Sequence, residues 1–319
     1  MVTALRWGVI GTGRIARTFA SDLTFIDDGT IVAVGSRTLS AAQRFAAEFG
    51  IDAAHGSYEE LVEDPSVEAV YVATPHPMHY ANARHALEAG KPVLVEKAFT
   101  MTVDEAVDLV AIARRRGLFL MEAMWTRFLP HIEALREIVS SGELGEIVEV
   151  IADHGKWFEK DPTSRLFAPE LGGSAMLDLG VYPVSFASMI LGTPARVVAM
   201  VTPAFSGVDA TASAVLGYDT GAQAIVTCTS SARSATRASV VGTNGRVEIE
   251  GDFYAPSSLV IIPRLGDPRR MDFVTRGRGL QYQASHVASL ITAGRTESDV
   301  MPLDESIAIM GTMRRIIES

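Results

Sequence analysis

The chain has 319 residues, of which 48% are hydrophobic and 21% charged, as in globular proteins with a large buried core and unlike disordered chains. A chain of this length favours two domains over one. Its formal net charge of −10 argues against general binding to nucleic acid, whose phosphates it would repel, although an anionic small ligand responds only to the local field.

The single cysteine, Cys228, excludes an internal disulfide and a zinc site built from clustered cysteines. The first residues lack the basic segment, apolar stretch and cleavage site of a signal peptide. No apolar run in the sequence approaches the roughly 18 residues that span a bilayer. We therefore expect a protein of the reducing cytoplasm that binds neither membranes nor nucleic acid.

The residues up to about Trp125 alternate short β-branched runs with helical patterns, which is typical of βαβ units. The predicted strands are Leu5–Ile10, Ile31–Gly35, Val67–Ala73, Val93–Glu96 and Phe119–Glu122. The predicted helices are Arg14–Leu23, Ala41–Phe49 with Ser40 as its cap, Met78–Ala89 and Val103–Arg115, with Gly90 and Gly117 as left-handed residues after the last two. Residues 1–125 thus predict a Rossmann-type α/β domain with a doubly wound parallel sheet.

The pattern changes after Trp125. Helices are predicted over His131–Val139 and Leu177–Leu191, and strands follow one another from Ala195 to Val274. Several of these strands alternate apolar and polar residues, which suits an antiparallel sheet with one face in water. Two helices, about Tyr282–Ala293 and Asp304–Ile317, end the chain. We expect residues 126–319 to form a second domain of the α+β class.

A glycine-rich turn stands between the first predicted strand and helix, with the pattern G-x-G-x-x-A over Gly11–Ala16. Gly11 permits the tight turn, Gly13 lets the backbone approach a pyrophosphate, and Ala16 keeps the helix close to the sheet. Thr12, Arg14 and Ile15 complete the loop, where N–H groups of the helix N-terminus are offered to phosphates. Its place at the first βα junction favours dinucleotide binding over an ordinary tight turn.

The end of the second predicted strand indicates which dinucleotide binds. An acidic residue there would accept hydrogen bonds from the ribose 2′-OH of NAD, but the sequence has Ser36 and Arg37. A hydroxyl and a guanidinium suit a 2′-phosphate, and Arg14 can add charge or stack on the adenine. The alternative for each arginine is a solvated surface charge. The missing acid favours NADP over NAD.

Two further groups of residues suggest proton chemistry. Glu96 and Lys97 stand where a parallel strand ends, at the edge where open α/β sheets bind ligands. Asp178 and Tyr182 are four residues apart at the start of a predicted helix and share one face. A lysine ammonium beside Tyr182 would favour the phenolate, so that the tyrosine can act as an acid–base group. The alternatives are an exposed lysine, an N-cap at Asp178 and a core aromatic at Tyr182.

Three histidines, His76, His79 and His85, raise the question of a metal. They lack an accompanying set of cysteines or carboxylates, and His79 stands at a helix start where it can meet a phosphate or ribose. We therefore expect no metal site.

Taken together, the motifs resemble the glucose–fructose oxidoreductase/inositol dehydrogenase (Gfo/Idh/MocA) family. They are the loop Gly11–Ala16, Thr74-Pro-His-Pro-Met-His79, Glu96-Lys97-Ala98 and Asp178-Leu-Gly-Val-Tyr182. Met121–Pro130 and Gly172–Tyr182 are similar to the branch of dimeric dihydrodiol dehydrogenases and NADP-dependent D-xylose dehydrogenases. The usual Glu-Lys-Pro reads Glu96-Lys97-Ala98 here, which removes no reactive group.

The resemblance implies roles for individual residues. Lys97 and Tyr182 would be catalytic, with Asp178 in support. Residues expected to border the cofactor are Tyr71, Thr74, His76, His79 and Glu96, and those expected to wall the substrate pocket are Trp125 and Phe158. It also implies that the second domain has an open, mostly antiparallel sheet, often used for dimerisation, so we expect a homodimer.

The sequence therefore predicts an enzyme that transfers hydride between NADP and a hydroxyl group. The expected substrate is an aldose such as D-xylose, oxidised to a lactone, or a trans-dihydrodiol. Two alternatives remain: a reductase of a keto sugar or dicarbonyl, and a non-catalytic sensor that binds NADP. The lysine–tyrosine pair speaks against the sensor, which needs no proton relay.

Overall fold

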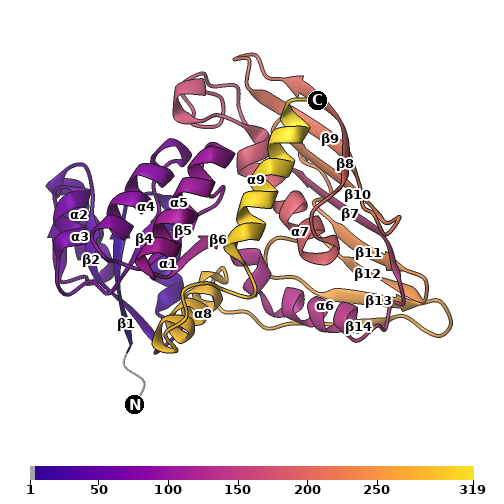
Figure 1. Ribbon diagram of the computed structural model, residues 1–319, viewed down its shortest axis with the longest axis horizontal. Coiled ribbons are helices and arrows are strands. Elements are labelled where there is room, and N and C mark those ends of the chain that lie inside the picture. The colour runs from indigo at the N-terminus through magenta and orange to yellow at the C-terminus, as the bar shows by residue number, and fades with distance from the viewer. Residues whose placement is uncertain (1–3) are drawn as a thin grey trace. The chain divides into compact units, whose positions relative to one another are not determined.

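The computed structural model describes residues 4–319, which divide into two compact units (Figure 1). The first unit comprises the residues up to Trp125 together with Arg276–Ser306. The second comprises Thr126–Thr275 together with Ile307–Ser319.

The first unit is built on a six-stranded parallel sheet in the order β3-β2-β1-β4-β5-β6. The strands are β1 (Leu5–Ile10), β2 (Gly29–Gly35), β3 (Ala53–His55), β4 (Ala69–Val72), β5 (Val93–Glu96) and β6 (Leu120–Ala123). The helices are α1 (Arg14–Leu23), α2 (Leu39–Phe49), α3 (Tyr58–Glu63), α4 (His79–Glu88), α5 (Val103–Arg116) and α8 (Leu280–Thr292). Because β2 and β4 flank β1, the winding direction reverses at β1, and ligands bind at the carboxyl end of such a switch point.

The predicted doubly wound fold is confirmed, and β1, α1 and β5 have the predicted bounds. Helix α5 carries a capping box between Thr102 and Glu105 and ends at Gly117, with φ 64°. Helix α2 begins at Leu39 with Thr38 as N-cap, so the prediction of Ser40 as the cap was wrong. The short elements β3 and α3 were not predicted.

Helix α8 returns to the first unit and is held there by Asp22, in the last turn of α1. The buried Asp22 carboxylate accepts backbone hydrogen bonds from Arg278 at 2.9 Å and from Gly279 and Leu280 at 2.8 Å each. These amides belong to the N-terminus of α8, which favours an anion. The expected second domain, 126–319, is thus interrupted, because residues 276–306 belong to the first unit.

The second unit contains an eight-stranded sheet in the order β14-β13-β12-β11-β7-β10-β9-β8. Its strands are β7 (Ile147–Gly155), β8 (Arg196–Pro203), β9 (Asp209–Gly217), β10 (Gln223–Thr229), β11 (Ala238–Gly242), β12 (Gly245–Ile249), β13 (Leu259–Pro263) and β14 (Arg269–Met271). Only β7 and β10 pair in parallel among the described strands of this sheet, which confirms the mostly antiparallel prediction. Strand β7, in the middle of the sheet, was not predicted.

The helices of the second unit begin with α6 (Pro130–Ser140), after a 3-10 turn at Trp125–Phe128. The predicted helix over Leu177–Leu191 is in two parts, a π-helical turn at Met176–Gly180 and α7 (Val181–Leu191). Both parts contact β7 and β10. Helix α9 (Leu303–Ile317) begins among residues of the first unit and ends in the second.

The stretch Pro169–Leu191 is long and apolar enough to span a membrane, contrary to our expectation that no run approaches that length. Only its length and composition suggest such a span. In the structure, 83% of its apolar window is buried inside the protein, as in a core helix. Burial against the sheet accounts for its apolar composition.

Candidate active site

The glycine-rich turn joins β1 to α1 at the switch point of the parallel sheet. Gly11 has φ +105°, and a Cβ there would lie 2.9 Å from the carbonyl oxygen of Ala73, so the turn requires glycine. Gly13 is the N-cap of α1, and a Cβ on it would meet no atom within 4 Å. The first turn of α1 has neither a side-chain cap nor an acidic residue, so its N–H groups can meet a phosphate. The loop therefore fits a dinucleotide pyrophosphate.

The end of β2 offers basic and hydroxyl groups. Ser36 is buried there, while the side chains of Arg37 and Arg14 are exposed. Burial raises the pKa of Tyr58 in α3, and the positive charge of Arg37 opposes that rise, so the two side chains lie near each other. The arrangement suits an anionic group beside Ser36.

Arg17, the third arginine of this region, is engaged elsewhere. Its guanidinium forms an ion pair with Glu48 and lies 5.4 Å from the ring centroid of Phe45. Arg17 is therefore a useful control for the two exposed arginines.

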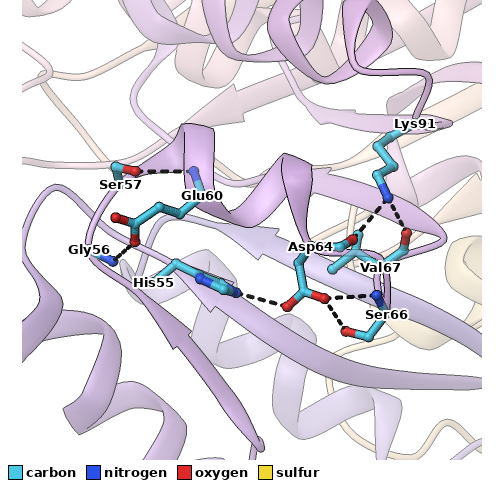
Figure 2. A network of polar contacts seen from close by, with 8 residues as sticks. All are labelled: His55, Gly56, Ser57, Glu60, Asp64, Ser66, Val67 and Lys91. Carbon is cyan, nitrogen blue, oxygen red and sulfur yellow. Dashed lines mark hydrogen bonds and ion pairs between the residues drawn. The ribbon is translucent and has the colours of Figure 1, made fainter.

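A polar network around Asp64 joins β3 to the turn after α3 (Figure 2). The Asp64 carboxylate accepts hydrogen bonds from the backbone and hydroxyl of Ser66 at 2.8 and 2.7 Å and lies 2.9 Å from Nε2 of His55. Burial acts to raise the pKa of Asp64, but these hydrogen bonds outweigh it and the pKa lies below its ordinary value. The His55 carbonyl accepts the N–H of Ser36 at 3.2 Å, and Lys91 donates to the Asp64 carbonyl at 3.0 Å. The network thus anchors β3 at His55, whose carbonyl binds the backbone of Ser36 after β2.

Glu96 and Lys97 stand at the carboxyl end of β5. The Tyr71 hydroxyl donates to the Glu96 carboxylate at 2.5 Å, and the Tyr71 ring stacks on Phe19 with centroids 4.0 Å apart. Lys97 is partly exposed, and its peptide bond to Ala98 is cis. Tyr71, expected to border the cofactor, has no exposed surface, so in this structure it supports Glu96.

His79 is the first residue of α4 and lies between the segments that follow β4 and β5. Its side chain is fully buried, with Nδ1 and Nε2 each 2.8 Å from a carbonyl oxygen, of Ala98 and Thr74 respectively. Burial lowers the pKa of His79, although the two carbonyls act in the opposite direction. The expected contact of His79 with a phosphate or ribose does not fit this enclosure. His79 instead joins the loop after β4 to the loop after β5.

Two other expected residues of this loop are also largely covered. Thr74 accepts a hydrogen bond from Asn82 at 3.1 Å, and the ring of His76 meets that of His79 edge-on at 5.5 Å. Among residues 4–319, no group of three or more histidine, cysteine or acidic side chains is placed to hold a metal ion.

Trp125, an expected wall of the substrate pocket, is buried to 3% exposure. The Arg278 guanidinium lies 5.3 Å from its ring centroid. The guanidinium of Arg278 thus lies over the indole ring, which we had expected to offer an apolar surface to the substrate. Arg278 was missed, because only the fold brings the α8 segment back to Trp125.

The second unit carries Asp178 and Tyr182. Asp178 lies in the π-helical turn and forms an ion pair with Arg165 at 3.1 Å. Tyr182 follows in the first turn of α7, whose N-cap is Gly180. The alternative in which Asp178 caps the helix is therefore wrong.

Two aromatic rings contact the ring of Tyr182. Its ring centroid lies 5.2 Å from that of His154 and 4.8 Å from that of Tyr254. His154 and Tyr254 stack at 4.4 Å, and Nζ of Lys156 lies 4.7 Å from the Tyr254 centroid. We call Tyr182, His154 and Tyr254 the ring cluster. Sequence analysis missed His154 because β7, which ends beside it, was not predicted.

Phe158 lies just beyond β7 and is half-buried. Its backbone N–H donates to the carbonyl of Ser230 at 3.1 Å, which ties this segment to the residue after β10. Lys97 belongs to the first unit and Tyr182 to the second, so their partnership stays a prediction.

Comparison with known proteins gives two family matches. Residues 5–124 match the oxidoreductase family with an NAD-binding Rossmann fold, and residues 132–248 match the GFO/IDH/MocA C-terminal domain. The trans-1,2-dihydrobenzene-1,2-diol dehydrogenase of Bos taurus is 39% identical over 313 residues, covering 95% of this chain and 93% of that protein.

Solved structures show the same fold. The 3-ketoreductase KijD10 from Actinomadura kijaniata, in complex with NADP and TDP-benzene, has a TM-score of 0.86 at 27% identity. The comparison covers 98% of this chain and 97% of that one. The aldose-aldose oxidoreductase of Caulobacter crescentus has a TM-score of 0.90 at 24% identity, over 99% and 97% of the two chains.

Proposed function

The chain belongs to the GFO/IDH/MocA family of oxidoreductases with an NAD-binding Rossmann domain, and from this premise we propose that it oxidises a hydroxyl of a trans-dihydrodiol or sugar with NADP. The observation that carries the proposal is that one chain combines two features. Its first unit has an uncapped phosphate loop and a basic end of β2, and its second unit has Tyr182 in a buried ring cluster. The dihydrodiol dehydrogenase of Bos taurus, similar over nearly its whole length, supports this substrate class.

In this proposal the first unit holds the cofactor. The N–H groups at the start of α1 bind the pyrophosphate, and Ser36 and Arg37 bind the ribose 2′-phosphate, with Arg14 adding charge. Bound NADP supplies the hydride acceptor. These groups favour NADP over NAD, because the 2′-phosphate of NADP carries about two negative charges and the ribose hydroxyls of NAD carry none.

Tyr182 removes the proton of the substrate hydroxyl as the carbon is oxidised. A free phenol has a pKa of about 10, so the reaction near neutral pH needs a group that favours the phenolate. We assign that part to the Lys97 ammonium. Asp178, held by Arg165, supports the position of the π-helical turn that precedes Tyr182.

The test is spectrophotometric measurement of NADP+ reduction with trans-dihydrodiols, aldoses including D-xylose, and polyols, each repeated with NAD+. Turnover that favours NADP+ with a diol or aldose is the expected result. Equal rates with both cofactors would contradict the role of Ser36 and Arg37.

A second candidate is the reduction of a keto sugar or dicarbonyl by the same residues working in reverse. The fold similarity to the 3-ketoreductase KijD10, at 27% identity, favours this reading. NADPH oxidation by keto sugars, without NADP+ reduction by any alcohol of the panel, would select it. Binding of NADP without turnover in either direction would favour a sensor.

We also propose that the eight-stranded sheet pairs with a second copy of the chain. Its outward face carries an apolar row across four neighbouring strands, formed by Val198, Val215, Ile225 and Ile151, which are in register. Val198 is 72% exposed and the nearby Met200 is 80% exposed. Such a face is costly to leave in water and suits a face-to-face sheet contact.

Sedimentation of the wild type and of Val198→Asp tests this arrangement. The wild type should have the mass of a dimer, and the substitution should yield a monomer because it places a charge in the apolar row. Arg246→Asp, farther along the sheet on β12, is the control. A monomeric wild type at micromolar concentration would refute the proposed dimer.

A further inference from the structure

Strand β3 forms one edge of the parallel sheet and is only three residues long. Its last residue, His55, pairs in register with Gly35 at the end of β2. The His55 carbonyl also accepts the N–H of Ser36, the next residue after β2, at 3.2 Å. A strand this short forms few backbone hydrogen bonds, so its position depends on the contacts of its side chains.

The side chain of His55 supplies such a contact. Its Nε2 lies 2.9 Å from the carboxylate of Asp64, the C-cap of α3, so the contact links the end of β3 to the end of that helix (Figure 2). Both side chains are largely shielded from water, with 22% of His55 and 13% of Asp64 exposed. An ionised carboxylate only accepts hydrogen bonds, so Nε2 carries a proton and donates it. Hydrogen bonds to a charged group are among the stronger ones in proteins.

Asp64 is itself held at several atoms. One carboxylate oxygen accepts the backbone N–H and the hydroxyl of Ser66 at 2.8 and 2.7 Å, and the other lies against His55. Nζ of Lys91 donates to the carbonyls of Asp64 and Val67 at 3.0 and 2.7 Å, which fixes the turn after α3. Burial acts to raise the pKa of Asp64, but its hydrogen bonds lower it below its ordinary value, so the carboxylate is ionised at neutral pH. Asp64 is thus a fixed anchor for His55.

Helix α3 meets the end of β2 at a second place. A Cβ on Gly35 would lie 3.1 Å from the carbonyl oxygen of Ser57, the N-cap of α3, so the start of the helix packs directly on the residue before Ser36. Reciprocal hydrogen bonds fix this start. The Glu60 N–H donates to the Ser57 hydroxyl at 3.1 Å, and the Gly56 N–H donates to the Glu60 carboxylate at 3.0 Å. The segment from β3 to the end of α3 therefore holds the end of β2 at two adjacent residues.

From this geometry we propose that His55 and Asp64 are positioning residues for cofactor selection, which hold Ser36 where its hydroxyl meets the ribose 2′-phosphate of NADP. The inference rests on the proposed function, in which Ser36 and Arg37 bind that phosphate. Neither His55 nor Asp64 contacts the cofactor in this proposal. The strength of a hydrogen bond falls steeply with poor distance and angle, so a loosened Ser36 binds the phosphate less well. NAD has no phosphate at this place, and its binding should hardly change.

The experiment is fluorescence titration with NADP+ and with NAD+ of the wild type and of His55→Leu, which keeps the bulk of the side chain but loses the hydrogen bond to Asp64. We expect the dissociation constant for NADP+ to rise about fivefold and that for NAD+ by less than about twofold, because a charge-assisted contact is weakened. His55→Gln, whose amide can still donate to Asp64, should recover most of the NADP+ affinity. Amide hydrogen exchange at Ser36, followed by NMR without cofactor, should become faster in His55→Leu, because this N–H donates to the His55 carbonyl.

A matched control is Ser66→Ala, which removes another hydrogen bond to the same carboxylate and leaves the contact with His55 in place. It should keep the wild-type ratio of the two dissociation constants and the wild-type exchange at Ser36. A wild-type ratio or unchanged exchange in His55→Leu would overturn the proposal, and so would an equal fall of the ratio in Ser66→Ala.

If His55→Leu does not fold, Asp64→Asn decides by the same criteria, because its neutral amide is a weaker acceptor for Nε2 of His55. Equal affinities of the wild type for the two cofactors, or an unchanged ratio in Arg37→Ala, would instead remove the proposed function on which the inference rests.

Discussion

The two units hold their candidate site residues by different means. In the first unit, the contacts are mainly with backbone groups. The carbonyls of Ala98 and Thr74 lie against the two nitrogens of His79, and three consecutive amides donate to Asp22. In the second unit, Tyr182 is held by the rings of His154 and Tyr254. Backbone geometry depends on the fold, whereas ring contacts depend on each side chain. Substitutions should therefore affect stability and cofactor binding in the first unit and turnover in the second.

The largest effect is expected at Tyr182. Replacing it with phenylalanine keeps the ring contacts but removes the acid–base hydroxyl, so turnover should fall by at least about a hundredfold. Steady-state kinetics measures this loss, and fluorescence titration should show unchanged NADP affinity, because the cofactor residues belong to the other unit. Turnover near the wild-type rate would show that Tyr182 only fills space.

The next effect is expected at Asp22, in the first unit. Asp22→Ala leaves the amides of Arg278, Gly279 and Leu280 without their acceptor in a buried setting, which should lower the free energy of unfolding by about 3 kcal/mol. Urea unfolding measures the loss. Asp27→Ala, an exposed neighbour, should change it by less than about 0.5 kcal/mol. Equal stabilities of the two variants would mean that α8 is held by its apolar contacts alone.

The fold of the first unit was predictable where local signals are strong. The glycine loop defined β1 and α1, and the run Val93–Glu96 is buried throughout, as parallel strands are. Strand β3 and helix α3 were missed because three and six residues give too short a pattern. The return of α8 depends on contacts between Asp22 and residues more than 250 positions away, which local patterns do not encode.

The candidate site was predictable only in part for the same reason. Glu96, Lys97, Asp178 and Tyr182 stand out because each lies in a compact motif. His154, Tyr254 and Arg165 reach Tyr182 or Asp178 from separate segments of the second unit. Strand β7 had a detectable signal in its β-branched run, and recognising it would have drawn attention to His154 at its end.

A smaller effect concerns acid stability in the second unit. His131 donates through Nε2 to the Phe253 carbonyl at 3.1 Å, and burial lowers its pKa from 6.5 to about 4. The unfolded chain then binds more protons than the folded one between these values, so stability falls as the pH drops through this window. From about pH 7 to about pH 5 the loss due to His131 should be about 2 kcal/mol.

His131→Gln isolates this contribution, because an amide can still donate to Phe253 but does not titrate in this range. Urea unfolding at both pH values should show a smaller acid loss for the variant, by about 2 kcal/mol. The remaining loss includes His79, whose pKa burial also lowers. Parallel stability curves for variant and wild type would refute a buried neutral His131.

The smallest effect is expected at Arg37 in the first unit and concerns the preference for NADP over NAD. Arg37→Ala should reduce the preference for NADP over NAD roughly tenfold, since one charge-assisted contact to a phosphate is lost. Arg17→Ala removes an equal charge from the same region, but Arg17 is committed to Glu48 and Phe45, so its loss should leave the preference unchanged. The ratio of kcat/KM for the two cofactors measures both variants. Because the pair is matched in charge, an equal fall in both would show that only the general field of the loop selects NADP, and the specific contact proposed for Arg37 would have to be abandoned.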